Sequence, residues 1–327
     1  NRPNLELMTD ASVLKIIINN KKAVGVQVKN RQGINAITAE SEIILCGGAI
    51  NSPQLLMLSG IGPKKVLEKV SIPCAHDLPG VGQNLQDHLT VNISYQIDHL
   101  DTFAELMRPI RMLKNLFQYF VKGNGLLTYP ASDIGVFFKT NNSLKTPNAQ
   151  IHFAPGAGKY NKDGAMAPIS GITASVCNLR PLSKGFIELN SSDPKEPPKI
   201  YANYLSEKSD IEPMIEGIKK VRHIFESPSI QKFNPKEMMP SLKHQEDDEI
   251  EELIRQECLS VYHPVGTCKM GVEKDCVVDP SLCVIGIKSL RIADASIFPK
   301  IISGNTNATC NAVGAKCAEL ILRKSRS

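Results

Sequence analysis

Residues 41–60 read SEIILCGGAINSPQLLMLSG, and they contain the clearest strand-to-helix transition of the chain. The apolar run from Ser41 to Cys46 has the length of a short buried strand, and it stops at the pair Gly47-Gly48. A helical pattern begins near Asn51, with Pro53 close to the first helical position, where a missing N–H is tolerated. A strand, paired glycines and a helix in this order are typical of an α/β sheet whose strand end faces a ligand.

The segments on either side of this transition carry shorter signals. Upstream, two β-rich runs, Ser12 to Ile18 and Ala23 to Lys29, flank four polar residues, which predicts a hairpin. Downstream, we expect a short helix over Lys64 to Val70. The stretch from Leu78 to Asn84 is rich in Gly and Pro, so we expect a loop of defined conformation there and no regular helix or strand.

From about residue 90, periodic apolar segments with scattered Gly and Pro replace the earlier sequence, and near residue 258 the sequence becomes Gly-rich again. We therefore expect residues 1–90 and 258–327 to belong to one domain and residues 91–257 to form an inserted domain. Isoleucines and a valine at helical spacing predict a helix from Ser209 to Phe225. A final helix is expected from about Cys310 to Arg323.

Composition excludes several classes of function. The 327 residues carry a net charge of +5 with the basic residues scattered, so nucleic acid is not expected as a partner. No apolar run approaches the roughly 20 residues that span a bilayer, which argues against a transmembrane segment. The nine cysteines form no CxxC pair, so we expect no metal site and mostly buried, free thiols.

Two separate stretches contain residues suited to catalysis, Tyr262 to Gly271 and Ser303 to Asn307. A histidine accepts a proton from an alcohol near neutral pH, and the Asn305 amide can hold the alcohol oxygen without titrating. If the final helix begins near Thr309, its free N–H groups follow Asn305 and favour negative charge on a reduced cofactor. A histidine followed by proline is also often a packed residue, so a purely structural role for His263 stays open.

Longer matches point to one family. These residues resemble the glucose–methanol–choline (GMC) family of flavin oxidoreductases. Within that family the sequence is most similar to insect glucose-dehydrogenase-like members, and it also resembles choline dehydrogenases. The matching stretches are Gly48 to Gly62, Leu78 to His88, Arg180 to Gly185, Asn203 to Leu205, His263 to Gly271, Val278 to Pro280 and Leu290 to Asn307. The family's N-terminal GxGxxG unit has no counterpart, so we expect this chain to be the C-terminal part of a longer protein.

The resemblance implies roles for individual residues. His263 is implied to be the catalytic base, and Asn305 stands where relatives carry His or Asn. Seven positions are implied to contact FAD, the expected cofactor: Val13, Gly47, Gly48, Ala49, Tyr262, Asp294 and Ala295.

The resemblance also implies a fold and an activity. The fold class is mixed α/β (α+β): a partial, Rossmann-like FAD-binding domain with an inserted substrate domain built on an antiparallel sheet. The activity is oxidation of the CH–OH group of a small alcohol or sugar, with electrons passing to a quinone-like acceptor or oxygen. Two alternatives stay open, a catalytically silent fragment that does not bind FAD and a hydroxynitrile-lyase-like member. Localisation is unknown, although insect relatives are often secreted.

Overall fold

The computed structural model describes residues 2–99, 101–130, 132, 134–160, 166–239 and 245–324. The chain divides into two compact units. Unit 1 comprises residues 1–87, 183–206 and 262–327, and unit 2 comprises residues 88–182 and 207–261.

One segment differs from the expected domain boundaries. Residues 183–206, expected in the inserted domain, pack within unit 1. The reason is local: Leu85 and Gly185 exchange backbone hydrogen bonds at 2.9 and 2.8 Å, and the Ile187 N–H donates to the Gly82 carbonyl at 2.7 Å. The side chain of Ile187 is buried in the core of unit 1. The chain therefore returns to unit 1 before it completes unit 2.

Unit 1 begins with a three-stranded antiparallel sheet of β1 (Ser12–Asn19), β2 (Lys22–Asn30) and β3 (Gly33–Thr38). Asn20 and Lys21 join the first two strands with φ angles of +48° and +57°. Two left-handed residues in a two-residue loop form a turn whose twist matches that of the flanking strands. The predicted hairpin is confirmed.

The predicted strand, glycine pair and helix are also present. β4 (Ile43–Leu45) pairs in parallel with β17 (Leu290–Ile292), which lies far along the chain, and α1 (Gly48–Leu58) follows β4. α1 begins at Gly48, earlier than predicted. The Gly48 N–H donates to the Asp294 carboxylate at 2.9 Å, and this remote acceptor stabilises the first turn.

Pro53 lies inside α1 and not in its first turn. Proline has no N–H, so it cannot donate to the carbonyl four residues earlier, which belongs to Ala49. The Thr267 hydroxyl donates to that carbonyl instead, at 2.6 Å. The loop that carries the predicted base is thereby attached to α1.

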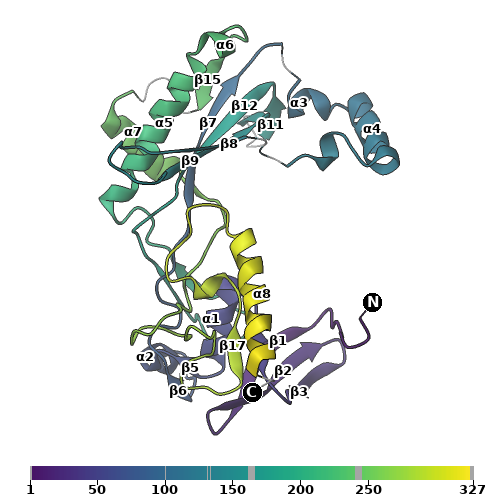
Figure 1. The fold of residues 1–327 in the computed structure, drawn as a ribbon, viewed down its shortest axis with the longest axis vertical. Helices are drawn as coiled ribbons and strands as arrows, with labels where there is room; N and C mark the ends of the chain where they lie inside the picture. The colour runs from purple at the N-terminus through teal and green to yellow at the C-terminus, as the bar shows by residue number, and fades with distance from the viewer. Residues whose placement is uncertain are drawn as a thin grey trace. The chain divides into compact units, whose positions relative to one another are not determined.

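Further short strands and helices, together with the long helix α8, complete unit 1 (Figure 1). They are α2 (Lys64–Lys69), β5 (Ile61–Gly62), β6 (His76–Asp77), β13 (Phe186–Glu188), β14 (Lys199–Tyr201), the one-turn helix η4 (Ala295–Ile297) and α8 (Asn307–Lys324). α8 packs against the core through Val313, Leu320 and Ile321. It begins at Asn307, earlier than the predicted Cys310. Among the described residues, no helix combines the length and apolar character needed to cross a bilayer.

Unit 2 is built on the predicted antiparallel sheet. Its strands follow the order β15-β7-β12-β9-β8, and β16 also pairs with β7. Their bounds are β7 (Leu89–Gln96), β8 (Ile134–Phe138), β9 (Ala149–Ala154), β12 (Gly171–Asn178), β15 (Lys236–Met239) and β16 (Leu259–Ser260). A separate hairpin pairs β10 (Ala157–Tyr160) with β11 (Met166–Ile169).

Helices cover one face of this sheet. α5 (Glu212–Phe225) packs on β12 so closely that a Cβ atom on Gly217 would lie 2.2 Å from Cγ1 of Val176. α7 (Asp247–Glu257) packs against α5 (Figure 1). The predicted helix starts at Glu212 because Lys208–Asp210 form a separate turn, η3. The remaining short helices are α3 (Phe103–Leu106), α4 (Pro109–Phe117), η1 (Gln118–Lys122), η2 (Leu126–Thr128) and α6 (Pro228–Gln231).

Candidate active site

The carboxyl ends of β4 and β17 place two predicted cofactor segments next to each other. The backbone continues from β17 through Ala293, whose N–H donates to the Leu45 carbonyl at 2.8 Å, to Asp294. The Asp294 carboxylate accepts hydrogen bonds from the Gly48 N–H at 2.9 Å and from the Ser52 hydroxyl at 2.6 Å. Its second oxygen accepts the Ser296 N–H at 2.8 Å. Asp294 is therefore a buried anion held by three donors.

The glycine turn before α1 is fixed by the same network. The Gly47 N–H donates to the Ser52 hydroxyl at 3.1 Å, and that hydroxyl in turn donates to Asp294. Gly48 has a φ of +78°, a conformation that residues with a Cβ rarely adopt. Sequence reasoning missed Ser52, although its position five residues after Gly47 in the first turns of a helix is typical of a hydroxyl that binds backbone groups.

The loop of residues 263–271 runs alongside the Asp294 segment. The N–H groups of Gly266 and Cys268 donate to the carbonyls of Ala295 and Ser296 at 3.1 and 2.8 Å. A Cβ atom on Gly266, whose φ is +92°, would lie 2.5 Å from the Asn84 carbonyl oxygen. Only glycine fits this close approach to Asn84, and the two hydrogen bonds hold the loop of the predicted base against Ala295 and Ser296.

His263 lies at the start of this loop and is half-buried. Its backbone N–H donates to Oδ1 of Asp87 at 2.9 Å, and the Tyr204 hydroxyl donates to Oδ2 at 2.7 Å. Burial lowers the pKa of the His263 imidazole below its ordinary value, while the nearby Asp87 carboxylate opposes that shift. The neutral imidazole, which can accept a proton, is therefore the favoured form at neutral pH.

Asp87 is the residue that sequence reasoning overlooked. It lies in the Leu78 to His88 stretch that resembles the family, but the resemblance implies no role for it. This buried carboxylate fixes the backbone of His263, and its charge opposes the lowering of the imidazole pKa by burial. An acidic residue at the end of a Gly-rich loop was the available signal.

Two predicted residues are exposed. Tyr262 is 87% exposed and has a φ of +60°, a strained conformation for a bulky residue. Asn305 is exposed in the irregular segment just before α8. The proposed contact of Tyr262 with a flavin, and of Asn305 with the same substrate oxygen as His263, stay predictions.

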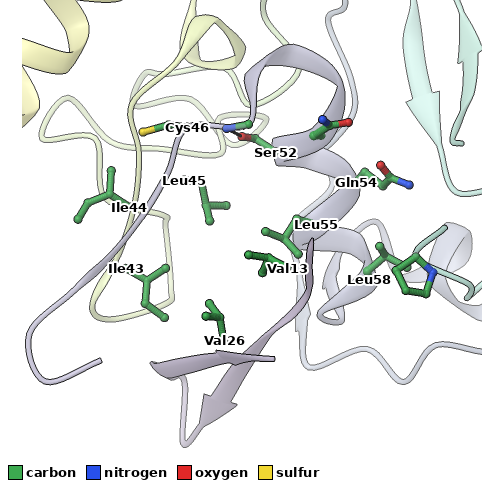
Figure 2. A pocket seen from close by; sticks show the side chains of 13 residues that line it. Val13, Val26, Ile43, Ile44, Leu45, Cys46, Ser52, Gln54, Leu55 and Leu58 are labelled. Carbon is green, nitrogen blue, oxygen red and sulfur yellow. Dashed lines mark hydrogen bonds between the residues drawn. The ribbon is translucent and has the colours of Figure 1, made fainter. Parts of the chain in front are cut away.

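Val13 and Gly47 line one cavity of 570 Å³ in unit 1. Figure 2 shows Val13, Val26 and Leu55 gathered around it, with the polar Ser52 of α1 among the lining residues. Most of the lining is aliphatic, and the volume falls within the range of roughly 300–1,000 Å³ that is usual for ligand pockets. An apolar wall beside a glycine turn and a helix N-terminus suits a flat ring attached to a polar chain.

A possible metal-ligand group is explained without a metal. Among the described residues, Glu273, Asp275 and Cys276 have ligand atoms within 4.8 Å of one another. Lys269 pairs with Asp275 at 2.6 Å, and the Cys276 thiol donates to Glu273 at 3.0 Å.

None of the nine cysteines forms a disulfide, but the prediction that most are buried is wrong. Cys46 is exposed, because the chain leaves β4 there and turns toward solvent before α1. The buried ones are Cys177, Cys268, Cys276 and Cys317.

Comparisons of the sequence with known proteins identify a family. GMC oxidoreductase models, one N-terminal and one C-terminal, match residues 1–90 and 181–314. The alcohol dehydrogenase [acceptor] of Pseudomonas putida is 42% identical over 99% of this chain and 59% of its own length. An oxygen-dependent choline dehydrogenase of Pectobacterium carotovorum is 37% identical, over 99% of this chain and 58% of the relative.

A solved structure shows the same fold over the whole chain. It is formate oxidase from Aspergillus oryzae, in a study of FAD modification, with a TM-score of 0.91, 27% identity and coverage of 100% of this chain and 62% of that one. The chain thus spans about 59% of the length of its curated relative from Pseudomonas. These curated relatives are bacterial, and the finer likeness to insect glucose dehydrogenases stays a prediction. Two family models, relatives that match along nearly all of its residues and a shared fold agree that this chain belongs to the GMC oxidoreductase family.

Proposed function

We propose that this chain forms the C-terminal part of an FAD-dependent oxidoreductase that oxidises CH–OH groups of small alcohols or sugars, with His263 as the base. The observation that carries the proposal is the environment of His263: a half-buried imidazole with a lowered pKa, whose backbone is fixed by a buried carboxylate. Oxidation of an alcohol to a carbonyl releases a hydride from carbon and a proton from oxygen. The proton needs a neutral base, and the lowered pKa of His263 favours its neutral form.

The residues of unit 1 fit a dinucleotide such as FAD. The cavity beside β4 offers Val13 and an aliphatic wall for a flat ring, and Gly47 exposes backbone next to it. Gly48, Ala49, Asp294 and Ala295 continue the same network toward the His263 loop, as the hydrogen bonds above describe. FAD, when bound, supplies the hydride acceptor.

His263 and Asn305 supply the remaining chemistry. The neutral imidazole takes the hydroxyl proton, and the amide of Asn305 donates a hydrogen bond to the substrate oxygen. Asp87 positions the base through the His263 backbone and favours the imidazolium that forms when the proton is taken up. The reaction would also require a final electron acceptor, for which a quinone-like compound or oxygen is proposed.

Unit 2 is proposed as the substrate-binding domain, because the sheet face opposite α5 is polar. Side chains alternate along a strand, so Thr173 and Ser175 of β12 point away from the face that packs Val176 against α5. Ser94 and Thr173 share a hydrogen bond of 3.0 Å, and Ser175 donates to Asn92 at 2.7 Å. Hydroxyl and amide groups of this kind bind alcohols and sugars.

The test is an absorbance titration of the purified 327-residue chain with FAD and then with a panel of alcohols under anaerobic conditions. We expect FAD to be bound and its visible band to bleach with at least one alcohol. His263→Gln should keep FAD but slow bleaching by about 10²–10⁴-fold, the usual contribution of a general base. His223→Gln is the matched control, because His223 is an exposed histidine of α5 in unit 2.

The outcomes separate the alternatives. A chain that takes up no FAD is the silent fragment, and the proposal then fails for these residues. Cyanide release from a cyanohydrin without bleaching by any alcohol identifies a lyase. Equal bleaching rates for the wild type and His263→Gln rule out His263 as the base.

A further inference from the structure

The segment that follows β7 in unit 2 exposes an unusual amount of apolar surface. It runs from α3 through α4, η1 and η2, and Figure 1 shows α4 beyond the edge of the unit 2 sheet. Six large apolar side chains of this segment are between 58% and 87% exposed: Met107, Ile110, Leu113, Phe117, Phe120 and Val121. Monomeric soluble proteins seldom leave so many large apolar side chains uncovered in one short segment.

These side chains lie on one side of the helix. Ile110, Leu113 and Phe117 follow the i, i+3, i+7 spacing that places residues on one helical face. The opposite side is turned inward: Asn115 is buried, and its amide donates to the Leu106 carbonyl at 2.9 Å. α4 contacts α3 and η2, and η1 continues directly from its last residue. The apolar face therefore points outward because of the fold.

Basic residues accompany the apolar face. Arg108, Arg111, Lys114 and Lys122 lie among residues 106–130, which contain no acidic residue. All four side chains are exposed, and that of Arg111 forms an ion pair with Asp101. The Glu105 carboxylate is held by the Thr102 hydroxyl and N–H at 2.6 and 3.0 Å in the cap of α3. The surface thus combines exposed Phe, Leu and Ile side chains with positive charge.

We propose that α4 and η1 form a docking surface for an anionic lipid bilayer. An amphipathic helix with aromatic and aliphatic residues on one face and Lys or Arg at its flank lies in the plane of a bilayer, with the apolar face among the acyl chains. α4 has nine residues, so it lies on the bilayer and does not cross it. The charge complementarity selects a negatively charged leaflet. This inference does not depend on the proposed oxidoreductase activity.

Co-sedimentation with lipid vesicles tests the apolar part of this surface. The 327-residue chain is mixed with vesicles of phosphatidylcholine containing phosphatidylserine, and with vesicles of phosphatidylcholine alone. We expect binding to the anionic vesicles, and a loss of at least tenfold in affinity for the double variant Ile110→Ser, Phe117→Ser. Val272→Ser is the matched control, because Val272 is 84% exposed in unit 1 and should leave binding unchanged.

A second pair of variants tests the charge without touching the apolar face. Lys114→Gln with Lys122→Gln should weaken binding to anionic vesicles by about fivefold per lysine, with little effect on phosphatidylcholine vesicles. The matched control removes two exposed lysines of unit 1, Lys65→Gln with Lys274→Gln. Circular dichroism establishes that each variant keeps its fold, which exposed positions favour.

Three results would overturn the proposal. The first is a wild-type chain that does not sediment with anionic vesicles. The second is equal vesicle binding by the α4 variants and their controls. The third is a dimer in sedimentation equilibrium that Ile110→Ser, Phe117→Ser dissociates, because the apolar face is then an interface between two copies of the chain.

Discussion

Oδ1 of Asp87 accepts the backbone N–H of His263 at 2.9 Å, so this carboxylate holds the segment that carries the imidazole although the two residues are distant in sequence. Asp87 also raises the pKa of His263 against the larger lowering by burial. We predict that Asp87→Asn lowers the pKa of His263 further, because the neutral amide no longer favours the imidazolium. An NMR titration of the imidazole measures this shift directly.

Tyr204→Phe is the control for that prediction. It removes the hydrogen bond to Oδ2 of Asp87 but keeps the negative charge next to His263. The pKa of His263 should therefore move less than in Asp87→Asn. A larger shift for Tyr204→Phe would mean that the orientation of Asp87, and not its charge, controls the histidine.

The depressed pKa of His263 also predicts a pH dependence of stability. Folding lowers the pKa of the imidazole below its ordinary 6.5, so between the two pKa values the unfolded chain binds more protons than the folded one. The free energy of unfolding then falls as the pH decreases from the unfolded pKa through the folded pKa. Urea unfolding of the wild type and His263→Gln at several pH values should show their difference changing in that window. A constant difference across this range contradicts the prediction.

Asp294 should be the most sensitive polar residue of the site. Asp294→Ala leaves the Gly48 N–H, the Ser52 hydroxyl and the Ser296 N–H without their acceptor. We expect a loss of roughly 2–4 kcal/mol in the free energy of unfolding, because several buried donors lose a charged partner. Ser52→Ala removes one donor and one acceptor and should cost roughly 1–2 kcal/mol. Chemical denaturation measures both, and equal losses would place the stabilisation on Ser52.

Local sequence patterns predicted the hairpin and the strand-to-helix transition of unit 1. The β-rich runs around Asn20 and the apolar strand before Gly47 depend on nearest neighbours along the chain, and both elements are where the pattern indicated. The start of α1 was placed too late, because its first turn is stabilised by Asp294, which lies far away in sequence. Hydrogen bonds between distant residues, such as those of Asp87 and Thr267, leave no periodic signal.

The contact between Thr267 and α1 provides the last prediction. Pro53 deprives the Ala49 carbonyl of its helical donor, and the Thr267 hydroxyl donates to it at 2.6 Å. Thr267→Val keeps the size of the side chain but leaves the buried carbonyl without that donor. We expect it to lower the free energy of unfolding by about 1–3 kcal/mol.

A double-mutant cycle separates this explanation from a packing effect. In a Pro53→Ala background the new backbone N–H can donate to the Ala49 carbonyl as in an ordinary helix. Thr267→Val should then cost less than it does beside Pro53, and the two substitutions should be non-additive. If Thr267→Val costs the same in both backgrounds, the hydroxyl does not replace the missing helical donor. The attachment of the His263 loop to α1 would then depend on packing around residue 267.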